Sequence, residues 1–407
     1  MKKILMATSF FPTSACDNLP QFLREQAVAV AEQHPDIEIL VVTSSRTGKK
    51  DAGLPSNITT RRFDYCWPTS RQQLTELGIM PAIKFNKFNI LALPLFFLFQ
   101  FLAIYKATKK FKPDLIYSHW FLPQGINCHL ISKIFNIPHS FTSHSYDVEV
   151  CKKIPFIGKT LVHAAFEHMT ACTVVSQKTL EGIKYFYSNE EWENIKNKIQ
   201  IIPMGIATPQ KTTAQKKDFS VVFLGRFVPK KGIHFLLEAV AELAKDLKNI
   251  HLTLAGDGPE KKDIIKKVAQ LDISAHVAMP GFVTEKAKQK LLETTDLYVL
   301  PSIDDGSGDR EGLPVSLLEA MSYGAICIAT YNSGVEDVVA DGINGYLVEQ
   351  KNASSLQQKI RQALSKAAES KNQMRLEAQS TAQNYYWNKI ANQTFEHLFS
   401  DLESERK

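Results

Sequence analysis

Short apolar runs alternate with longer stretches of helical periodicity along almost the whole chain of 407 residues. In the first half the runs include KILMATSF, IEILVVTS and DLIYSHW, and in the second half SVVFLGR, HLTLAGDG and DLYVLPS. Buried parallel strands have such apolar sequences, and parallel neighbours need a crossover segment between them, usually a helix. The pattern therefore predicts an α/β protein built from βαβ units with parallel sheets.

The alternation is interrupted once, by the polar, lysine-rich segment 206–218, which lacks periodicity and is typical of a linker. A chain of 407 residues also exceeds what one hydrophobic core usually supports. We therefore predict two doubly wound domains, 1–205 and 219–385, whose strand ends face a common cleft. The segment 386–407 has helical periodicity and is predicted to form a final helix.

Composition changes this picture little. Hydrophobic residues make up 44% of the chain and charged residues 22%, which is ordinary for a soluble globular protein. The six cysteines form no CxxC pair, which fits a reducing cytosol, and the apolar stretch at the N-terminus is too short for a signal peptide. The net charge of +6 is mild, and we expect no nucleic-acid partner.

One segment differs from the rest in its charge. Between Leu77 and Pro113 there is no acidic residue, and the lysines there are Lys84, Lys87, Lys106, Lys109, Lys110 and Lys112. The apolar run between them, FNILALPLFFLFQFLAI, is slightly short for a transmembrane span and is interrupted by Asn89, Pro94 and Gln100. A buried helix explains much of this pattern. Lysines beside phenylalanines also suit an anionic membrane surface, so we expect peripheral contact with the cytoplasmic face of a membrane.

The stretch DDGSGDREGLPVSLLEAMSYGA places two carboxylates, Glu311 and Glu319, around a predicted helix start. Pro314 is expected at the first helical position, and Gly312 allows close approach of a phosphate to the free N–H groups there. Glu319 can accept hydrogen bonds from two hydroxyl groups, as a ribose would supply, and Glu311 can contact a sugar beyond the phosphates. For either carboxylate alone, a solvated surface residue is the favoured explanation.

A second motif, GRFVPKKGIHF, places Arg226 at the end of a strand and Lys231 just before a helix. A guanidinium fork and an ammonium group both suit phosphate. The two motifs together suit a ligand with a hydroxyl-rich nucleoside, a diphosphate and a sugar. A dinucleotide-binding domain is less favoured, because GDGPEK lacks the third glycine of that fingerprint.

These motifs resemble those of the retaining GT-B glycosyltransferases of family 4, the glycosyl transferases group 1. Glu311 and Glu319 match the family's E-x7-E motif, and GRFVPKKG matches the Arg and Lys that bind the donor diphosphate. The segments GDGPE, PGFV and IIPMGI also match. The resemblance implies a GT-B fold whose final helix crosses back to the first domain. It also implies that Arg226 and Lys231 neutralise the leaving diphosphate, with no metal and no cofactor.

The resemblance further assigns contacts with the donor. Glu319 would hold the ribose, and the backbone at Phe282 and Val283 would meet the nucleobase. The other donor-binding residues would be Gly225, Arg226, Lys231, Glu311, Gly312, Leu313 and Pro314. In the first half, FTSHSYDVE matches the family's histidine segment. The implied catalytic residues are then His144, Glu311, Arg226 and Lys231.

The resemblance thus implies retaining transfer of a sugar from a nucleoside diphosphate sugar to a hydroxyl group of a saccharide. We expect this acceptor to be lipid-linked and to belong to surface polysaccharide synthesis. Two alternatives stay open. A non-catalytic nucleotide-sugar-binding protein is suggested by the acceptor loop 14–21, which lacks the glycines usual in the family, and a GT-B sugar epimerase would share the donor motifs. The motifs do not identify the base or the sugar of the donor.

Overall fold

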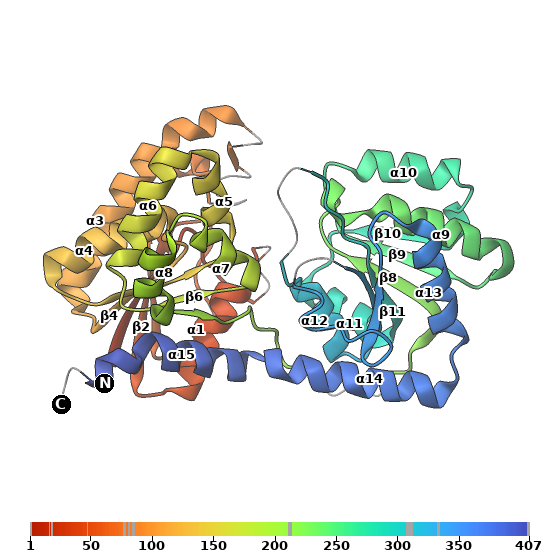
Figure 1. Cartoon of the computed structure of the whole chain (residues 1–407). Helices are drawn as coiled ribbons and strands as arrows, with labels where there is room; N and C mark the ends of the chain where they lie inside the picture. The colour runs from red at the N-terminus through yellow and green to blue at the C-terminus, as the bar shows by residue number, and fades with distance from the viewer. Residues whose placement is uncertain are drawn as a thin grey trace. The chain divides into compact units, whose positions relative to one another are not determined.

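The computed structural model describes the chain apart from residues 1, 16, 18, 47, 76–78, 80, 81, 84, 85, 211–213, 307–311, 332, 333 and 405–407, and apart from the side chains of 155 and 400–404. Residue contacts divide the chain into two compact units. The first unit comprises Met1–Gly205 together with Trp387–Lys407, and the second comprises Ile206–Tyr386. In each unit helices cover both faces of a parallel sheet, as the alternating pattern predicts (Figure 1).

The first unit contains a seven-stranded parallel sheet in the order β3-β2-β1-β4-β5-β6-β7. Its strands are β1 (Lys2–Ala7), β2 (Ile37–Ser44), β3 (Ile58–Phe63), β4 (Leu115–His119), β5 (His139–Ser143), β6 (Cys172–Val174) and β7 (Ile199–Ile201). The strand order reverses between β1 and β4. Ligands of such sheets bind beyond the carboxyl ends of the strands at this point.

The helices of the first unit are α1 (Phe22–Gln33), α3 (Leu93–Phe111), α4 (Ile126–Phe135), α5 (Tyr146–Lys153), α6 (Pro155–Glu167), α7 (Gln177–Lys184), α8 (Asn189–Ile195) and α15 (Trp387–Ser404). The final helix α15 packs against α1 (Figure 1). Trp387 Nε1 donates a 2.8 Å hydrogen bond to Glu25 Oε2, and the rings of His34 and Phe395 stack 4.0 Å apart. The C-terminal helix therefore belongs to the first unit, as the resemblance implied.

The second unit contains a six-stranded parallel sheet in the order β10-β9-β8-β11-β12-β13. Its strands are β8 (Lys217–Leu224), β9 (His251–Ala255), β10 (Val277–Gly281), β11 (Thr295–Leu300), β12 (Ile326–Thr330) and β13 (Gly345–Val348). Its helices are α9 (Ile233–Asp246), α10 (Lys261–Gln270), α11 (Glu285–Thr294), α12 (Val315–Ser322), α13 (Ala353–Ser365) and α14 (Ala368–Ala382). The strand order reverses between β8 and β11, so the loops after these two strands occupy the usual ligand position.

The edges of the predicted linker take part in the second unit. Ile206 forms an isolated β-bridge with Tyr386, and the last residues of the predicted linker lie in β8. Lys216 Nζ donates hydrogen bonds to the backbone oxygens of Leu292 (3.1 Å) and Tyr323 (2.7 Å). The polar composition of the segment did not predict these contacts, because the sequence does not distinguish a lysine that binds backbone carbonyls from a solvated lysine.

The lysine-flanked apolar segment forms one continuous helical stretch, Lys87–Phe111, made of the 3₁₀ helix η2 (Lys87–Ala92) and α3. An 18-residue window of this stretch has a mean hydropathy of 2.0, so by length and composition alone the helix is long and apolar enough to cross a membrane. The helix is longer than the apolar run of the sequence prediction, because it extends beyond that run at both ends. One face of α3 packs on the sheet, with Phe96 and Ile104 fully buried.

Candidate functional site

Two loops of the second unit meet at the carboxyl edge of its sheet. The loop Gly225–Lys231 follows β8, and the residues from Pro301 onward follow β11. Ile303 N donates a 2.7 Å hydrogen bond to Lys230 O, which ties the two loops together. Gly232 has φ +59°, and a Cβ there would lie 2.1 Å from Pro301 O. Glycine is therefore required at this position for both its backbone conformation and the close approach of the second loop.

The two predicted phosphate-binding cations occupy different surroundings in the first of these loops. Arg226 is exposed, whereas Lys231 is only 8% exposed. The Lys231 side chain runs beside the backbone of Gly225, since a Cβ built on Gly225 would lie 3.6 Å from Lys231 Cε. One positive charge is thus open to solvent and the other is held by packing. Such a pair suits a diphosphate, because a guanidinium fork and an ammonium group bind phosphate oxygens in different ways.

The predicted anion site at the start of α12 follows the second loop. Pro314 is the N-cap residue of α12 and the helix begins at Val315, so Pro314 lies one position earlier than the sequence predicted. Gly334, in the loop after β12, packs against this turn, because a Cβ there would come within 2.8 Å of Leu313 N. Gly312 and Leu313 are partly exposed beside the helix N-terminus, where free N–H groups favour anions. Glu311 lies outside the described residues.

Glu319, in α12, forms a buried ion pair that the sequence did not predict. Its Oε1 lies 2.5 Å from Nζ of Lys288 in α11, and the same ammonium group lies 2.8 Å from Glu285 Oε2. Burial raises the pKa of Glu319, and Lys288 counteracts that effect. Burial acts against the charge on Lys288 as well, but the carboxylates of Glu319 and Glu285 raise its pKa overall. The i,i+3 spacing of Glu285 and Lys288 was visible in the sequence, whereas the contact with Glu319 is tertiary.

The predicted nucleobase contacts lie at the end of β10. Phe282 follows this strand directly and is 66% exposed. Gly281 before it has φ +78°, and the Thr284 hydroxyl after it accepts a hydrogen bond from Ala287 N at the start of α11. Because all strands of this sheet are parallel, Phe282 and Val283 lie on the same edge as the loops after β8 and β11. The structure therefore brings every described donor-site prediction to one edge of one sheet.

In the first unit, two histidines lie at the carboxyl ends of neighbouring strands. His119 ends β4 and His144 follows β5, and their Nδ1 and Nε2 atoms are 3.0 Å apart. The rings of Trp120 and Phe22 lie 4.6 and 5.2 Å from that of His144. Burial lowers the pKa of His144 to about 3 and also lowers that of His119. Both imidazoles are therefore neutral at pH 7. His119 is fully buried, whereas His144 is partly exposed and suits hydrogen bonding to a sugar hydroxyl better than proton abstraction.

Asp147, three residues after His144, stabilises the local backbone. Its carboxylate accepts hydrogen bonds from the Ser143 hydroxyl (2.7 Å) and from the N–H groups of Phe121 (3.1 Å) and Val148 (3.1 Å). Burial raises its pKa to about 6. These contacts join the turn after β4 to the start of α5. They fix the backbone on both sides of the histidine pair.

The predicted acceptor loop, which lacks glycine, is held by a buried carboxylate. Asp17 accepts hydrogen bonds from Thr13 N (2.9 Å) and the Thr13 hydroxyl (2.8 Å), and it forms ion pairs with Arg46 and Lys49. Burial acts to raise the pKa of Asp17, but Arg46 and Thr13 outweigh burial and hold it well below its usual value. The described part of this loop is therefore ordered by side-chain contacts.

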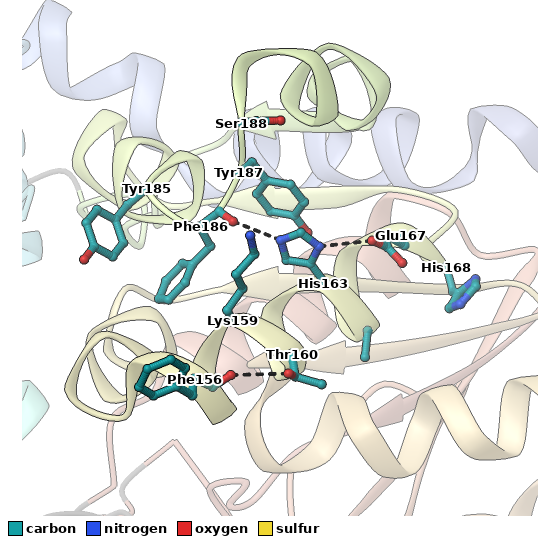
Figure 2. A pocket seen from close by; sticks show the side chains of 11 residues that line it. Phe156, Lys159, Thr160, His163, Glu167, His168, Tyr185, Phe186, Tyr187 and Ser188 are labelled. Carbon is teal, nitrogen blue, oxygen red and sulfur yellow. Dashed lines mark hydrogen bonds and ion pairs between the residues drawn. The ribbon is translucent and has the colours of Figure 1, made fainter.

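A cavity of about 900 Å³ lies elsewhere in the first unit, along α6 and the segment Tyr185–Ser188. As Figure 2 shows, His163 at its centre bonds Glu167 Oε1 (3.1 Å) and Phe186 O (2.9 Å). The His163 ring also stacks on Tyr187 at 4.2 Å. The polar groups at the centre of the cavity are thus occupied by one another. Among the described residues, none that the sequence predicted as a site residue lines this cavity.

Two doubly wound parallel units, with the C-terminal helix packed on the first, define the GT-B fold. The structure of Anabaena HepE in complex with UDP has a TM-score of 0.68 at 18% identity, covering 98% of this chain and 100% of that chain. The sucrose-phosphate synthase of Thermosynechococcus elongatus has a TM-score of 0.72 at 17% identity, with both chains covered completely. These comparisons confirm the predicted fold.

Residues 206–381, which lie in the second unit, match the family described as glycosyl transferases group 1. WcaL of Escherichia coli (strain K12), named for colanic acid biosynthesis, is 29% identical over 169 residues, 40% of this chain and 42% of that protein. The amylovoran biosynthesis glycosyltransferase AmsK of Erwinia amylovora is 27% identical over 164 residues, 39% of this chain and 40% of AmsK. The alignments thus span less than half of either relative.

Proposed function

We propose that the protein is a retaining glycosyltransferase that uses a nucleoside diphosphate sugar as donor. One observation gives this proposal its main support. Arg226 and Lys231 follow β8, while the N-terminus of α12 and Glu319 follow β11, so groups suited to a diphosphate and to a ribose flank one reversal of strand order. The match of residues 206–381 to the glycosyl transferases group 1 supports the assignment, and the HepE neighbour solved with UDP makes UDP the first nucleotide to test.

In the proposed reaction the bond between the sugar C1 and the diphosphate oxygen breaks, and C1 bonds to the acceptor oxygen on the same face. The acceptor hydroxyl gives its proton to the departing phosphate oxygen. Arg226, Lys231 and the N–H groups at the start of α12 stabilise the negative charge that grows on the diphosphate. The neutral imidazole of His144 serves as a hydrogen-bonding partner for a sugar hydroxyl.

Calorimetric titration with UDP, ADP and GDP and with their sugars tests the donor site, using wild type, R226A and K231A. The matched control is K262A, which removes an exposed lysine of α10. We expect R226A and K231A to weaken binding of the preferred nucleotide and K262A to leave it unchanged. Tight donor binding without turnover would favour a non-catalytic binding protein. An altered sugar released without acceptor would favour an epimerase.

The proposed acceptor is a lipid-linked saccharide of surface polysaccharide synthesis, reached from the cytoplasmic face of the membrane. The names of WcaL and AmsK, from colanic acid and amylovoran biosynthesis, support the polysaccharide part. The support for a membrane comes from the outer face of η2 and α3. Its exposed side chains include Phe88 (79%), Leu91 (72%), Leu95 (44%), Leu98 (52%), Phe99 (41%) and Leu102 (37%).

These side chains, hereafter the apolar face, follow helical spacing and form one stripe. Leu130 and Ile134 of α4, which packs against α3, are also exposed. Lys106, Lys109 and Lys110 are exposed and continue the stripe toward the end of α3. Monomeric soluble proteins rarely expose so many contiguous large apolar residues. Because the opposite face of α3 packs on the sheet, the proposed arrangement is a helix that lies in an anionic membrane surface.

A further inference from the structure

The ammonium group of Lys288 lies between two carboxylates at the edge of the proposed donor site. Its Nζ is 2.5 Å from Glu319 Oε1 and 2.8 Å from Glu285 Oε2. The side chains of Lys288 and Glu319 are only 17% and 19% exposed. The contact joins two helices, α11, which directly precedes β11, and α12, which follows the loop after β11. A long, flexible lysine side chain is thereby fixed against the carboxylate predicted to hold the ribose.

The other ionisable groups near Glu319 do not replace this cation. Glu285 and Glu293 of α11 are acidic, and Glu285 acts to raise the pKa of Glu319. The phenol of Tyr323, the residue that follows α12, has its pKa raised first by burial and then by Glu293 and Glu285. Lys288 therefore supplies the positive charge in contact with Glu319, and it opposes both the desolvation of this carboxylate and the repulsion by its acidic neighbours.

We propose that Lys288 is a positioning residue for the donor: it fixes the Glu319 carboxylate in one orientation and keeps it ionised to accept the ribose hydroxyls. The inference rests on the donor site proposed above. A carboxylate has about four acceptor positions, so one oxygen can bind Lys288 while the group still accepts two hydroxyl hydrogen bonds. Hydrogen bonds to a charged acceptor are about twice as strong as neutral ones, which makes the ionised state matter for affinity.

The inference has a consequence for pH. Without Lys288 the buried carboxyl group of Glu319 binds its proton more tightly, so its pKa rises further. Below that pKa the ionised fraction, and with it the affinity for the ribonucleotide, falls by about tenfold per pH unit. A lysine with a merely structural role would not produce this slope. The selectivity for UDP over 2′-deoxy-UDP would fall in parallel, because the deoxy compound lacks one of the hydroxyls.

Calorimetric titration with UDP and 2′-deoxy-UDP, between about pH 5.5 and pH 8.5, tests the inference. The variants are K288M, K288R, E319Q and the matched control K286M, which removes an exposed lysine of the same helix. We expect K288M to lose about tenfold or more in UDP affinity at the acidic end and to recover toward the basic end. K288R and K286M should follow the wild-type profile, and E319Q should bind weakly at every pH.

The outcomes separate this inference from the proposed function. If E319Q binds UDP, ADP and GDP as wild type does, Glu319 is not a donor ligand, and both the donor-site assignment and the role of Lys288 fail. If E319Q loses affinity while K288M matches wild type at every pH, only the role of Lys288 is overturned. An equal, pH-independent loss in K288M and K288R would also overturn it, because it would show a purely structural role. K288R keeps the charge, so it tests the inference even if K288M does not fold.

Discussion

Replacing Phe88 and Leu91 of the apolar face should release the protein from anionic membranes. Phe88 is 79% exposed and Leu91 is 72% exposed, so little of either side chain contributes to the folded core. Full burial of a Phe or Leu side chain contributes about 2 kcal/mol, so the exposed parts of these two supply about 3 kcal/mol in a membrane. That amount corresponds to about a 100-fold change in the partition coefficient. We therefore expect the double variant F88S/L91S to lose most of its membrane binding.

Liposome flotation measures this effect, with vesicles of neutral lipid and vesicles that also contain anionic lipid. The variant K106Q/K109Q/K110Q should lose about 1 kcal/mol of binding free energy per lysine on anionic vesicles and none on neutral vesicles. Added salt should reduce the difference between this variant and wild type on anionic vesicles. The matched control is L376S, which replaces a leucine that is 60% exposed on α14 of the second unit. All variants should unfold at the wild-type temperature, because the replaced side chains are exposed.

Three results would refute this reasoning. Wild-type protein that stays with neither kind of vesicle would exclude a membrane role for the apolar face. Equal binding to neutral and anionic vesicles would exclude the contribution of the lysines. A loss in L376S as large as that in F88S/L91S would show that general surface hydrophobicity, rather than this face, determines flotation.

Further predictions concern catalysis and stability. R226A and K231A should each lower turnover by about 10²–10³-fold, and EDTA should leave turnover unchanged, because these cations are proposed to stabilise the leaving diphosphate. Near-normal turnover in both variants would overturn the proposed diphosphate site. E311Q should lower turnover at saturating donor with little change in donor affinity, and the opposite pattern would show that Glu311 and Glu319 have exchanged roles. D17N should lower the free energy of unfolding by about 3 kcal/mol at neutral pH, since it breaks a buried ion pair. The pKa of Asp17 is lower in the folded than in the unfolded protein. Its contribution to stability is therefore fully present above the unfolded pKa of about 3.9 and is lost as the pH falls through the lower folded pKa. The free energy of unfolding is measured from denaturation curves at pH 7 and at strongly acidic pH. An equal difference between D17N and wild type at both pH values would contradict a stabilising role for the ionised Asp17.

The sheets were predictable because their sequence signals are local. β11 reads DLYVL, an apolar run that only a strand buried on both faces explains economically, and the structure buries all of it. The position of Arg226 at a strand end followed from the same pattern. In contrast, the sequence did not indicate which face of α3 is covered. The segment is apolar on nearly all sides, so periodicity could not separate the buried Phe96 from the exposed Leu95.

The missed features depend on contacts between distant segments. Lys288 is one of several lysines in a polar helix, and only the packing of α11 against α12 identifies it as the partner of Glu319. Likewise, the family's missing glycines drew attention to the acceptor loop, but the sequence did not show that Asp17 would bind Arg46, 29 residues away. The exact start of α12 was missed by one position, because Pro314 is suited to both the N-cap and the first helical turn.

The most direct test of the central claim follows the donor sugar by NMR during turnover. The protein is incubated with UDP-, GDP- and ADP-sugars labelled with ¹³C at C1, together with vesicles that contain lipid-linked saccharides. We predict that one donor is consumed, that its nucleoside diphosphate is released, and that the new glycosidic bond keeps the anomeric configuration of the donor. A linkage of inverted configuration would contradict retaining glycosyl transfer. So would a result in which none of the donors tested is consumed.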